Sequence, residues 1–109
     1  MLKIKSILVS LLAVAALWDT WGHDEEVLHS CCLITTDANP LMQPVHHRMP
    51  VILDESEQEI WLNNTQCVKE QLMALLKSYP YNDLEGYRVS ALVNKTSFDH
   101  PLAIRPLSL

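Results

Sequence analysis

The feature that most limits the fold of this 109-residue chain is a polar, proline-broken loop between two short apolar runs. The apolar runs cover residues 31–35 and 51–53, and both have the length and composition of β-strands. Asn-Pro and Gln-Pro pairs within residues 39–44 disfavour a helix between them. The sequence therefore predicts two strands joined by an irregular loop.

This loop ends in a histidine pair, His46 and His47. A loop held by two strands can fix a reactive side chain in position. Histidine exchanges protons near neutral pH, so the pair is a candidate acid/base site. The alternative is a histidine pair that only makes hydrogen bonds within the loop.

Around the loop, the hydrophobic pattern favours an α+β, strand-dominated fold with two short helices. Asp54-Glu55-Ser56-Glu57 resembles a capping box and predicts a helix through about residue 62. Apolar residues at helical spacing over 68–76 predict a second helix, capped near Thr65 and ended by Pro80. Strands are predicted at about residues 7–18, 29–36, 49–53 and 87–94.

The tryptophans are expected in packing roles. Trp18 and Trp21 are three residues apart on a predicted strand, so their side chains leave opposite faces. Packing in a core or hinge is favoured for them over stacking on nucleic-acid bases. Trp61 falls on the capped helix and is most simply a core residue.

Four segments, in order along the chain, resemble the SOS response-associated peptidase family, the abasic-site processing proteins. ITTDANPLMQPVHHRMPVIL (residues 34–53) is similar to the family's TT-x-AN…H-x-RMP-x-IL signature. AALWDTW (15–21) and YRVSALVN (87–94) resemble two of its strands, and residues 100–106 resemble its closing tail. The resemblance covers residues 13–106 and implies a mixed-sheet, barrel-like half-domain.

This resemblance implies that residues 1–109 are the C-terminal portion of a single domain. Residues 1–12 lie outside the match and are either divergent or a gene-model artefact. It implies that the N-terminal half holds the family's nucleophile, a cysteine directly after the initiator methionine, and a catalytic glutamate. Position 2 here is Leu2, so this chain is expected to be inactive alone. A half-domain also leaves sheet edges and apolar faces uncovered, so we expect poor folding and aggregation.

The resemblance further implies an activity. In the family, the N-terminal cysteine attacks the ring-opened aldehyde of an abasic site in single-stranded DNA and closes a thiazolidine, which leaves a covalent DNA–protein crosslink. Autoproteolytic loss of methionine exposes that cysteine, so the implied enzyme class is a peptidase or hydrolase. The implied partners are abasic single-stranded DNA and the missing N-terminal half as a separate chain. No cofactor is implied.

The family signature H-x-RMP assigns the catalytic histidine to His46 and leaves His47 at a variable position. His46 is then expected to assist sugar ring opening and proton transfer. Arg48, Asn39 and Asn94 are candidate DNA-binding or site-lining residues. A structural ion pair is favoured for Arg48 over a phosphate contact, and turn formation is the simpler role for Asn39.

The charge of the chain argues against DNA binding by these residues alone. Eight Lys and Arg residues against thirteen Asp and Glu residues give a net charge of −5. DNA affinity comes largely from cations that neutralise phosphates. A metal site is not expected either, because two of the three cysteines are adjacent and the five histidines lack ligand spacing.

Residues 1–15 carry two interpretations. A basic start, an apolar run and a small-x-small triplet at 13–15 are typical of a secretory signal peptide, which is too short to span a membrane. The family match begins inside this run, which favours a β-strand, a cytoplasmic location and no membrane partner. The alternatives are a small secreted non-enzymatic protein and a nonfunctional gene fragment.

Overall fold

The computed structural model describes residues 2–6, 11–63, 68–80 and 83–108. The chain divides into two compact units. One is formed by residues 12–79 and is called here the histidine unit. The other combines residues 1–11 with residues 80–109 and is called the terminal unit. No helix in the described part of the chain is both long and apolar enough to cross a membrane.

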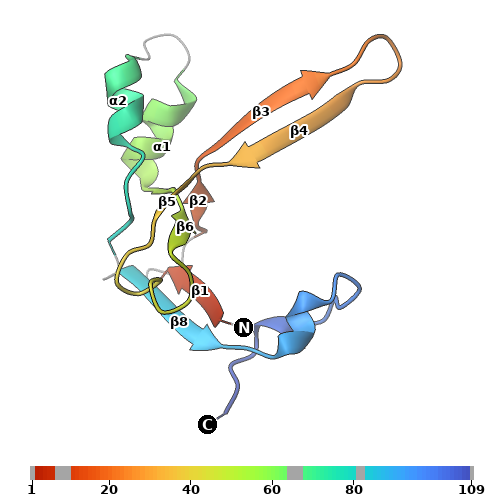
Figure 1. Ribbon diagram of the computed structural model, residues 1–109, viewed down its shortest axis with the longest axis vertical. Coiled ribbons are helices and arrows are strands. Elements are labelled where there is room, and N and C mark those ends of the chain that lie inside the picture. Colours follow the sequence, from red (N-terminus) through yellow and green to blue (C-terminus); the bar gives the residue numbers. More distant parts are fainter. Residues whose placement is uncertain (1, 7–10, 64–67, 81–82, 109) are drawn as a thin grey trace. The chain divides into compact units, whose positions relative to one another are not determined.

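The histidine unit contains six short strands and two helices among its described residues (Figure 1). Three antiparallel ladders pair β2 with β7, β3 with β4, and β5 with β6. This agrees with the α+β, strand-dominated fold predicted from the sequence. The elements are β2 (Ala13–Val14), β3 (Ala16–Trp21), β4 (Leu28–Leu33), β5 (Thr35–Asp37), β6 (Arg48–Pro50), β7 (Ile52–Leu53), α1 (Glu55–Leu62) and α2 (Lys69–Ala74).

The three ladders meet at a cyclic junction of single residues. The Ala15 amide donates to the Val51 carbonyl at 2.9 Å, the Val51 amide to the Ile34 carbonyl at 2.9 Å, and the Ile34 amide to the Ala15 carbonyl at 3.0 Å. Each of these residues separates two strands, and each segment changes its pairing partner there. The strands predicted at 29–36 and 49–53 are therefore each divided in two.

The core of the histidine unit is built on this junction. Ala15 and Val51 are buried, and they cluster with Leu53 and Leu75. Ile34, Trp61 and Leu76 pack against that cluster as partly buried side chains. The Trp61 indole N–H donates to the Ala16 carbonyl at 3.3 Å, which satisfies its polar atom. The core role predicted for Trp61 is confirmed.

Helix α1 begins where the capping pattern predicts. The Asp54 side chain accepts a hydrogen bond from the Glu57 amide at 2.8 Å and another from the Ser56 hydroxyl at 2.8 Å. These two bonds, the amide first, hold the pKa of Asp54 below its ordinary value of 3.8. The pKa of Glu57 shifts in the opposite direction, because burial raises it above its ordinary value of 4.5.

The Asp54 cap should make the start of α1 sensitive to acid. A carboxylate with a lowered pKa contributes stability above its unfolded value, and that stability is lost as the pH falls through the lowered pKa, below 3.8. We expect the exchange of the Glu57 amide, measured by NMR, to accelerate in that range relative to mid-helix amides. Asp54→Ser keeps an acceptor that does not titrate and should abolish the acceleration; the same acid response in both proteins would contradict the assignment.

The second helix is shorter than predicted. Helix α2 spans Lys69–Ala74 with Val68 as its N-cap residue, and the predicted cap at Thr65 lies outside the described residues. Of the apolar stripe, Leu75 is buried and Leu76 is partly buried against the core, but Val68 is exposed. The helix ends well before Pro80. The amide of its C-cap residue, Leu75, donates to the Leu72 and Met73 carbonyls and closes the last turn there.

The terminal unit pairs β1 (Leu2–Ser6) with β8 (Leu84–Arg88) as an antiparallel ladder. The strand predicted at 87–94 is wrong beyond Arg88. Ser90 instead caps a 3-10 helix, η2 (Ala91–Asn94), by accepting the Leu92 amide at 3.2 Å. A serine hydroxyl that accepts the backbone amide two residues further on competes with strand pairing, which explains the change. A second 3-10 helix, η3 (Pro101–Ile104), lies in the tail.

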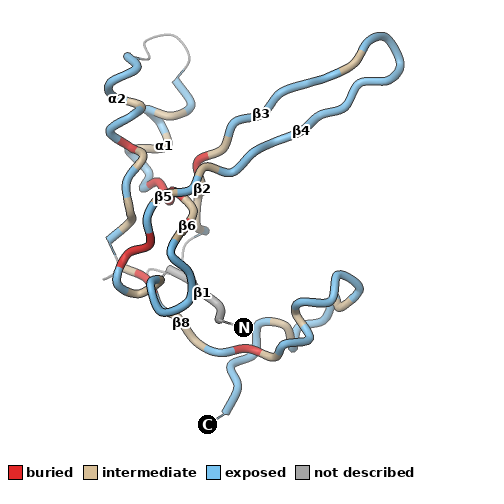
Figure 2. Tube along the Cα trace, viewed as in Figure 1, coloured by how far each residue is buried: buried red, intermediate tan, exposed pale blue. Residues whose placement is uncertain are grey.

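The β3–β4 hairpin differs most from the sequence expectation. Its residues are nearly all exposed (Figure 2), and the core or hinge packing predicted for Trp18 and Trp21 is absent from the described structure. Gly22 has a positive φ of 115°, and a Cβ there would collide with the Glu26 carbonyl. The glycine is therefore required for the turn. Residues 7–10 of the predicted first strand lie outside the described residues.

Candidate functional site

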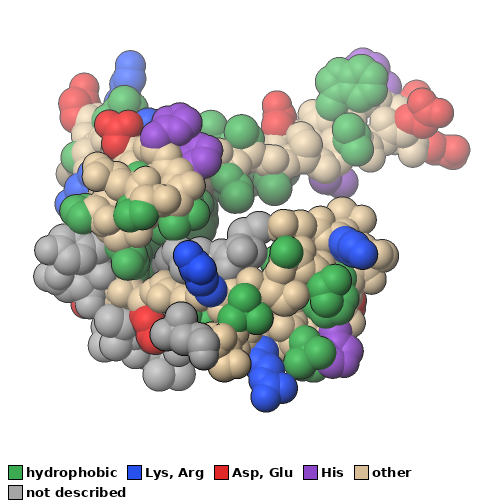
Figure 3. All heavy atoms as spheres, turned by 60° about the horizontal axis from the view of Figure 1, so that its bottom comes forward, with side chains coloured by type: hydrophobic (Ala, Val, Ile, Leu, Met, Phe, Trp, Pro, Cys, Tyr) green, Lys and Arg blue, Asp and Glu red, His purple; other side chains and the backbone are tan. Residues whose placement is uncertain are grey.

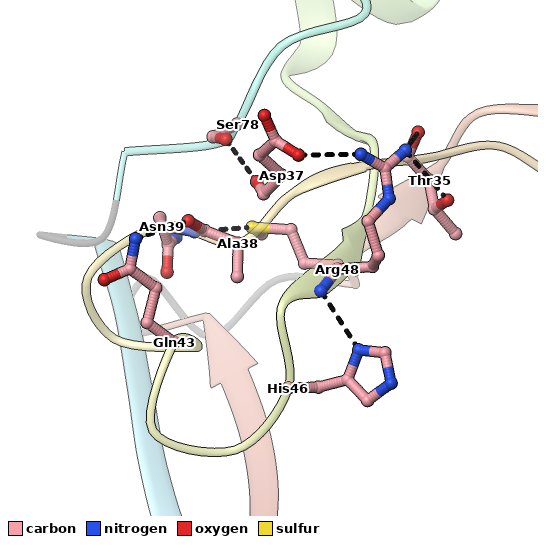
Figure 4. Close-up of polar contacts among 9 residues, drawn as sticks. Thr35, Asp37, Ala38, Asn39, Gln43, His46, Arg48 and Ser78 are labelled. Carbon is pink, nitrogen blue, oxygen red and sulfur yellow. Dashed lines mark hydrogen bonds and ion pairs between the residues drawn. The ribbon is translucent and has the colours of Figure 1, made fainter.

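The histidine loop connects β5 to β6. The two strands pair from Thr35 with Pro50 to Asp37 with Arg48, and the Ala38 amide extends the ladder to the His47 carbonyl at 3.0 Å. The loop is thus closed at its base by backbone hydrogen bonds. The loop contains Pro40 and Pro44, which lack a backbone N–H, and it starts at a buried asparagine whose side chain is drawn in Figure 4.

Asn39 is that asparagine, and it is only 5% exposed. Its side-chain carbonyl accepts the Met42 amide at 3.0 Å, and its side-chain amide donates to the Tyr79 carbonyl at 2.8 Å. The Asn39 amide also donates to the Met49 sulfur at 3.4 Å. These bonds give Asn39 the turn-forming role that the sequence favoured, and they tie the loop to the segment after α2.

His46 lies exposed at the end of the loop, and its orientation is fixed from one side. Its Nδ1 accepts the Arg48 backbone amide at 3.0 Å, and its own amide donates to the Met42 carbonyl at 3.0 Å. With Nδ1 as an acceptor, the neutral ring carries its proton on Nε2. Nε2 is then the N–H donor of the His46 ring.

His47 stacks against His46. The two ring centroids are 4.4 Å apart, with an angle of 21° between the ring planes. This contact limits the rotation of the His46 ring. His47 itself is exposed, so its side chain acts on His46 mainly through packing.

Arg48 is held by the strand next to it. Its guanidinium pairs with the Asp37 carboxylate at 2.8 Å and donates to the Thr35 carbonyl at 2.8 Å and hydroxyl at 3.3 Å (Figure 4). This is the structural ion pair that the sequence favoured. The pair is partly exposed, so its value lies mainly in orienting the β5–β6 ladder rather than in net stability.

Two supporting residues were not predicted from the sequence. The Ser78 hydroxyl donates to the Asp37 carbonyl, and Asp37 in turn pairs with Arg48. Ser78 and Tyr79 follow α2, about forty residues after the loop they support, and nothing local in the sequence marks them. Only the contact between distant segments shows their role.

Asn94 belongs to the other unit of the chain. It ends η2 in the terminal unit, whereas His46, Arg48 and Asn39 belong to the histidine unit. Among the described residues, no three His, Cys, Asp or Glu side chains gather closely enough to hold a metal ion. Within the described part of the histidine unit, His46 is an oriented imidazole on a loop whose base is closed by backbone hydrogen bonds.

Comparison with known proteins gives a consistent result. The family model described as SOS response associated peptidase (SRAP) matches residues 3–96. "Abasic site processing protein YoqW" from Bacillus subtilis is 40% identical over 101 residues, which cover 92% of this chain and 44% of that protein. "Abasic site processing protein HMCES" from Gallus gallus is 33% identical over 102 residues, which cover 91% of this chain and 30% of that protein.

A solved structure agrees with the sequence matches. The crystal structure of a Bacteroides thetaiotaomicron protein superposes with a TM-score of 0.82 at 28% identity, and the match covers 97% of this chain and 48% of that one. The chain thus spans less than half the length of each of these three proteins.

Proposed function

Because this chain belongs to the SOS response-associated peptidase family, we propose that it contributes the histidine-bearing portion of a protein that processes abasic sites in single-stranded DNA. The observation that carries this proposal is the fixed orientation of His46, whose Nδ1 is occupied and whose Nε2 is available. An exposed, oriented imidazole suits proton transfer to a flexible, ring-opened sugar.

The chemistry needs a nucleophile from the rest of the domain. An N-terminal cysteine amine condenses with the sugar aldehyde to form an imine and releases water. The thiol then adds to the imine carbon while its proton moves to nitrogen, which closes the thiazolidine. In this proposal, His46 donates a proton to the sugar oxygen as the ring opens and helps the carbinolamine lose water. The peptidase step, which removes the methionine before that cysteine, belongs in this proposal to the portion of the domain that these residues do not span.

DNA contacts must come largely from the same portion. The net charge of this chain is −5, and the Arg48 guanidinium is already paired with Asp37 and Thr35. Phosphate binding needs free cations, so the complementary half is the proposed source of most of the affinity. A DNA substrate also implies a cytoplasmic protein, and a secreted mature form beginning at Ala16 would contradict it.

The substrate is tested with protein reconstituted from this chain and the complementary half of a relative. A denaturation-resistant band shift should form on a single-stranded oligonucleotide with one abasic site. The same oligonucleotide without the lesion should give none, and a duplex with the lesion should give much less. Equal yields on intact and abasic strands would show that the aldehyde is not the target.

A further inference from the structure

The Asn39 side chain joins the histidine loop to the segment that follows α2. Its amide group donates to the Tyr79 carbonyl at 2.8 Å, and its carbonyl oxygen accepts the Met42 amide at 3.0 Å. Both polar atoms of the carboxamide are therefore used, and they bond to two different segments. Because Asn39 is only 5% exposed, the loss of either bond in place costs more free energy than it would at the surface.

Met42 carries this connection on to His46. The Met42 amide is bonded to the Asn39 backbone carbonyl at 3.0 Å as well as to the Asn39 side chain. The Met42 carbonyl in turn accepts the His46 amide at 3.0 Å. A single residue thus separates the Asn39 carboxamide from the backbone of His46, and a shift of Met42 would shift His46 with it.

The position of the His46 ring depends on this backbone, because its side chain is exposed. Figure 3 shows histidine side chains at the surface of the molecule, where a ring changes rotamer more easily than in a core. The His46 ring accepts the Arg48 amide at 3.0 Å, and this bond forms only while the end of the loop stays close to β6. Asn39 also reaches that strand, since its amide donates to the Met49 sulfur at 3.4 Å.

Ser78 provides a second bond from the segment after α2. Its hydroxyl donates to the Asp37 carbonyl (Figure 4). Asp37 and Asn39 are the two neighbours of Ala38, so Ser78 and the residue after it each hold one side of the start of the loop. Two adjacent bonds resist rotation of this part of the chain, which one bond alone would allow.

We propose that Asn39 is a positioning residue for proton transfer by His46, an inference that rests on the proposed function. Asn39 fixes the Met42 peptide, and Met42 fixes the backbone from which the His46 ring meets the Arg48 amide. A direct contact of Asn39 with DNA is disfavoured, because its side chain is buried and both of its polar atoms are bonded within the protein. A positioning role predicts a lower maximal rate with unchanged DNA binding.

The test uses Asn39→Asp in protein reconstituted from this chain and the complementary half of a relative. The new carboxylate has nearly the same shape and still accepts the Met42 amide, but it cannot donate to the Tyr79 carbonyl. Crosslinking of an abasic oligonucleotide at saturating protein should slow by about tenfold or more, because a small misplacement of a reacting group is costly. The protein concentration that gives half of the maximal rate should stay within about twofold of the parent's.

Gln43→Ala is the matched control. Gln43 carries a carboxamide in the same loop, but it is exposed, and its bond to the Ala38 carbonyl is long, at 3.4 Å. Its maximal rate should equal the parent's. A rise in the half-saturating concentration of Asn39→Asp at an unchanged maximal rate would instead make Asn39 a DNA contact and would overturn the positioning role, as would an unchanged rate.

A second measurement needs no DNA. In the same reconstituted protein with this chain labelled with ¹⁵N, Asn39→Asp should speed exchange of the Arg48 amide and shift the His46 Nδ1 resonance, since the bond between them weakens. The Ile34 and Val51 amides of the strand junction should stay protected. If the junction loses protection too, Asn39 supports the whole fold and the proposal is wrong. If these signals change as expected but the parent forms no crosslink, the proposed function fails and the positioning of His46 by Asn39 stands.

Discussion

Mixing this chain with the complementary half of a relative is expected to raise its crosslinking to abasic single-stranded DNA by at least about 100-fold over the chain alone. The reason is the chemistry of thiazolidine closure, which requires an amine and a thiol on the same residue. Cys31, Cys32 and Cys67 are internal, so their nitrogens are committed to peptide bonds. Their thiols can add reversibly to an aldehyde, but they cannot close the ring.

The measurement is the yield of covalent product on a denaturing gel after a fixed incubation. The complementary half alone is the first control, because it carries the nucleophile but not His46. A complementary half with its N-terminal cysteine replaced by serine is the second, and the reconstituted protein should then give background yield. Efficient crosslinking by the 109-residue chain alone would mean that one of its internal thiols, two of which are free and exposed, reacts by another route.

Much of the fold follows from local signals in the sequence. The capping pattern at Asp54 located the start of α1, and the strand-type runs on both sides of the histidine loop became β4, β5, β6 and β7. What the sequence does not reveal is that each run changes partner at one residue. Ile34 and Val51 look like ordinary strand residues, and only their shared junction with Ala15 gives them their role. The hydrophobic periodicity of a short sequence window does not show which distant segments pair with each other.

In the candidate site, too, local signals could be predicted from the sequence and contacts between distant segments could not. The choice of His46 over His47 came from the family signature and stays a prediction, whereas the favoured roles of Arg48 and Asn39 agree with their contacts. The partners that hold them, Ser78 and Tyr79, could not be predicted, because they are brought in by the chain that follows α2. The exposure of Trp18 and Trp21 was also missed, since an apolar strand pattern indicates burial and does not show whether another described segment packs against the strand.

Replacing His46 should slow crosslinking in the reconstituted protein by about 100-fold or more, the usual range for loss of a positioned general acid or base. Two variants separate proton transfer from loop structure. His46→Ala removes both the titrating ring and the acceptor for the Arg48 amide. His46→Asn offers a side-chain oxygen to that amide but cannot exchange protons near neutral pH. If proton transfer is the role, both variants are slow to a similar extent.

His47→Ala is the matched comparison, because it removes a neighbouring imidazole and leaves the bond from the Arg48 amide to His46 in place. Only the 4.4 Å stacking contact is lost, so the rate should fall by less than about fivefold, a small packing term rather than a chemical one. Rates are compared as single-exponential appearance of the covalent product at saturating protein. A His46→Ala rate equal to the parent's would falsify the role given to His46. A larger loss in His47→Ala would mean that the family signature is misaligned here by one residue, with His47 as the proton-transfer group and His46 as the ring that packs against it.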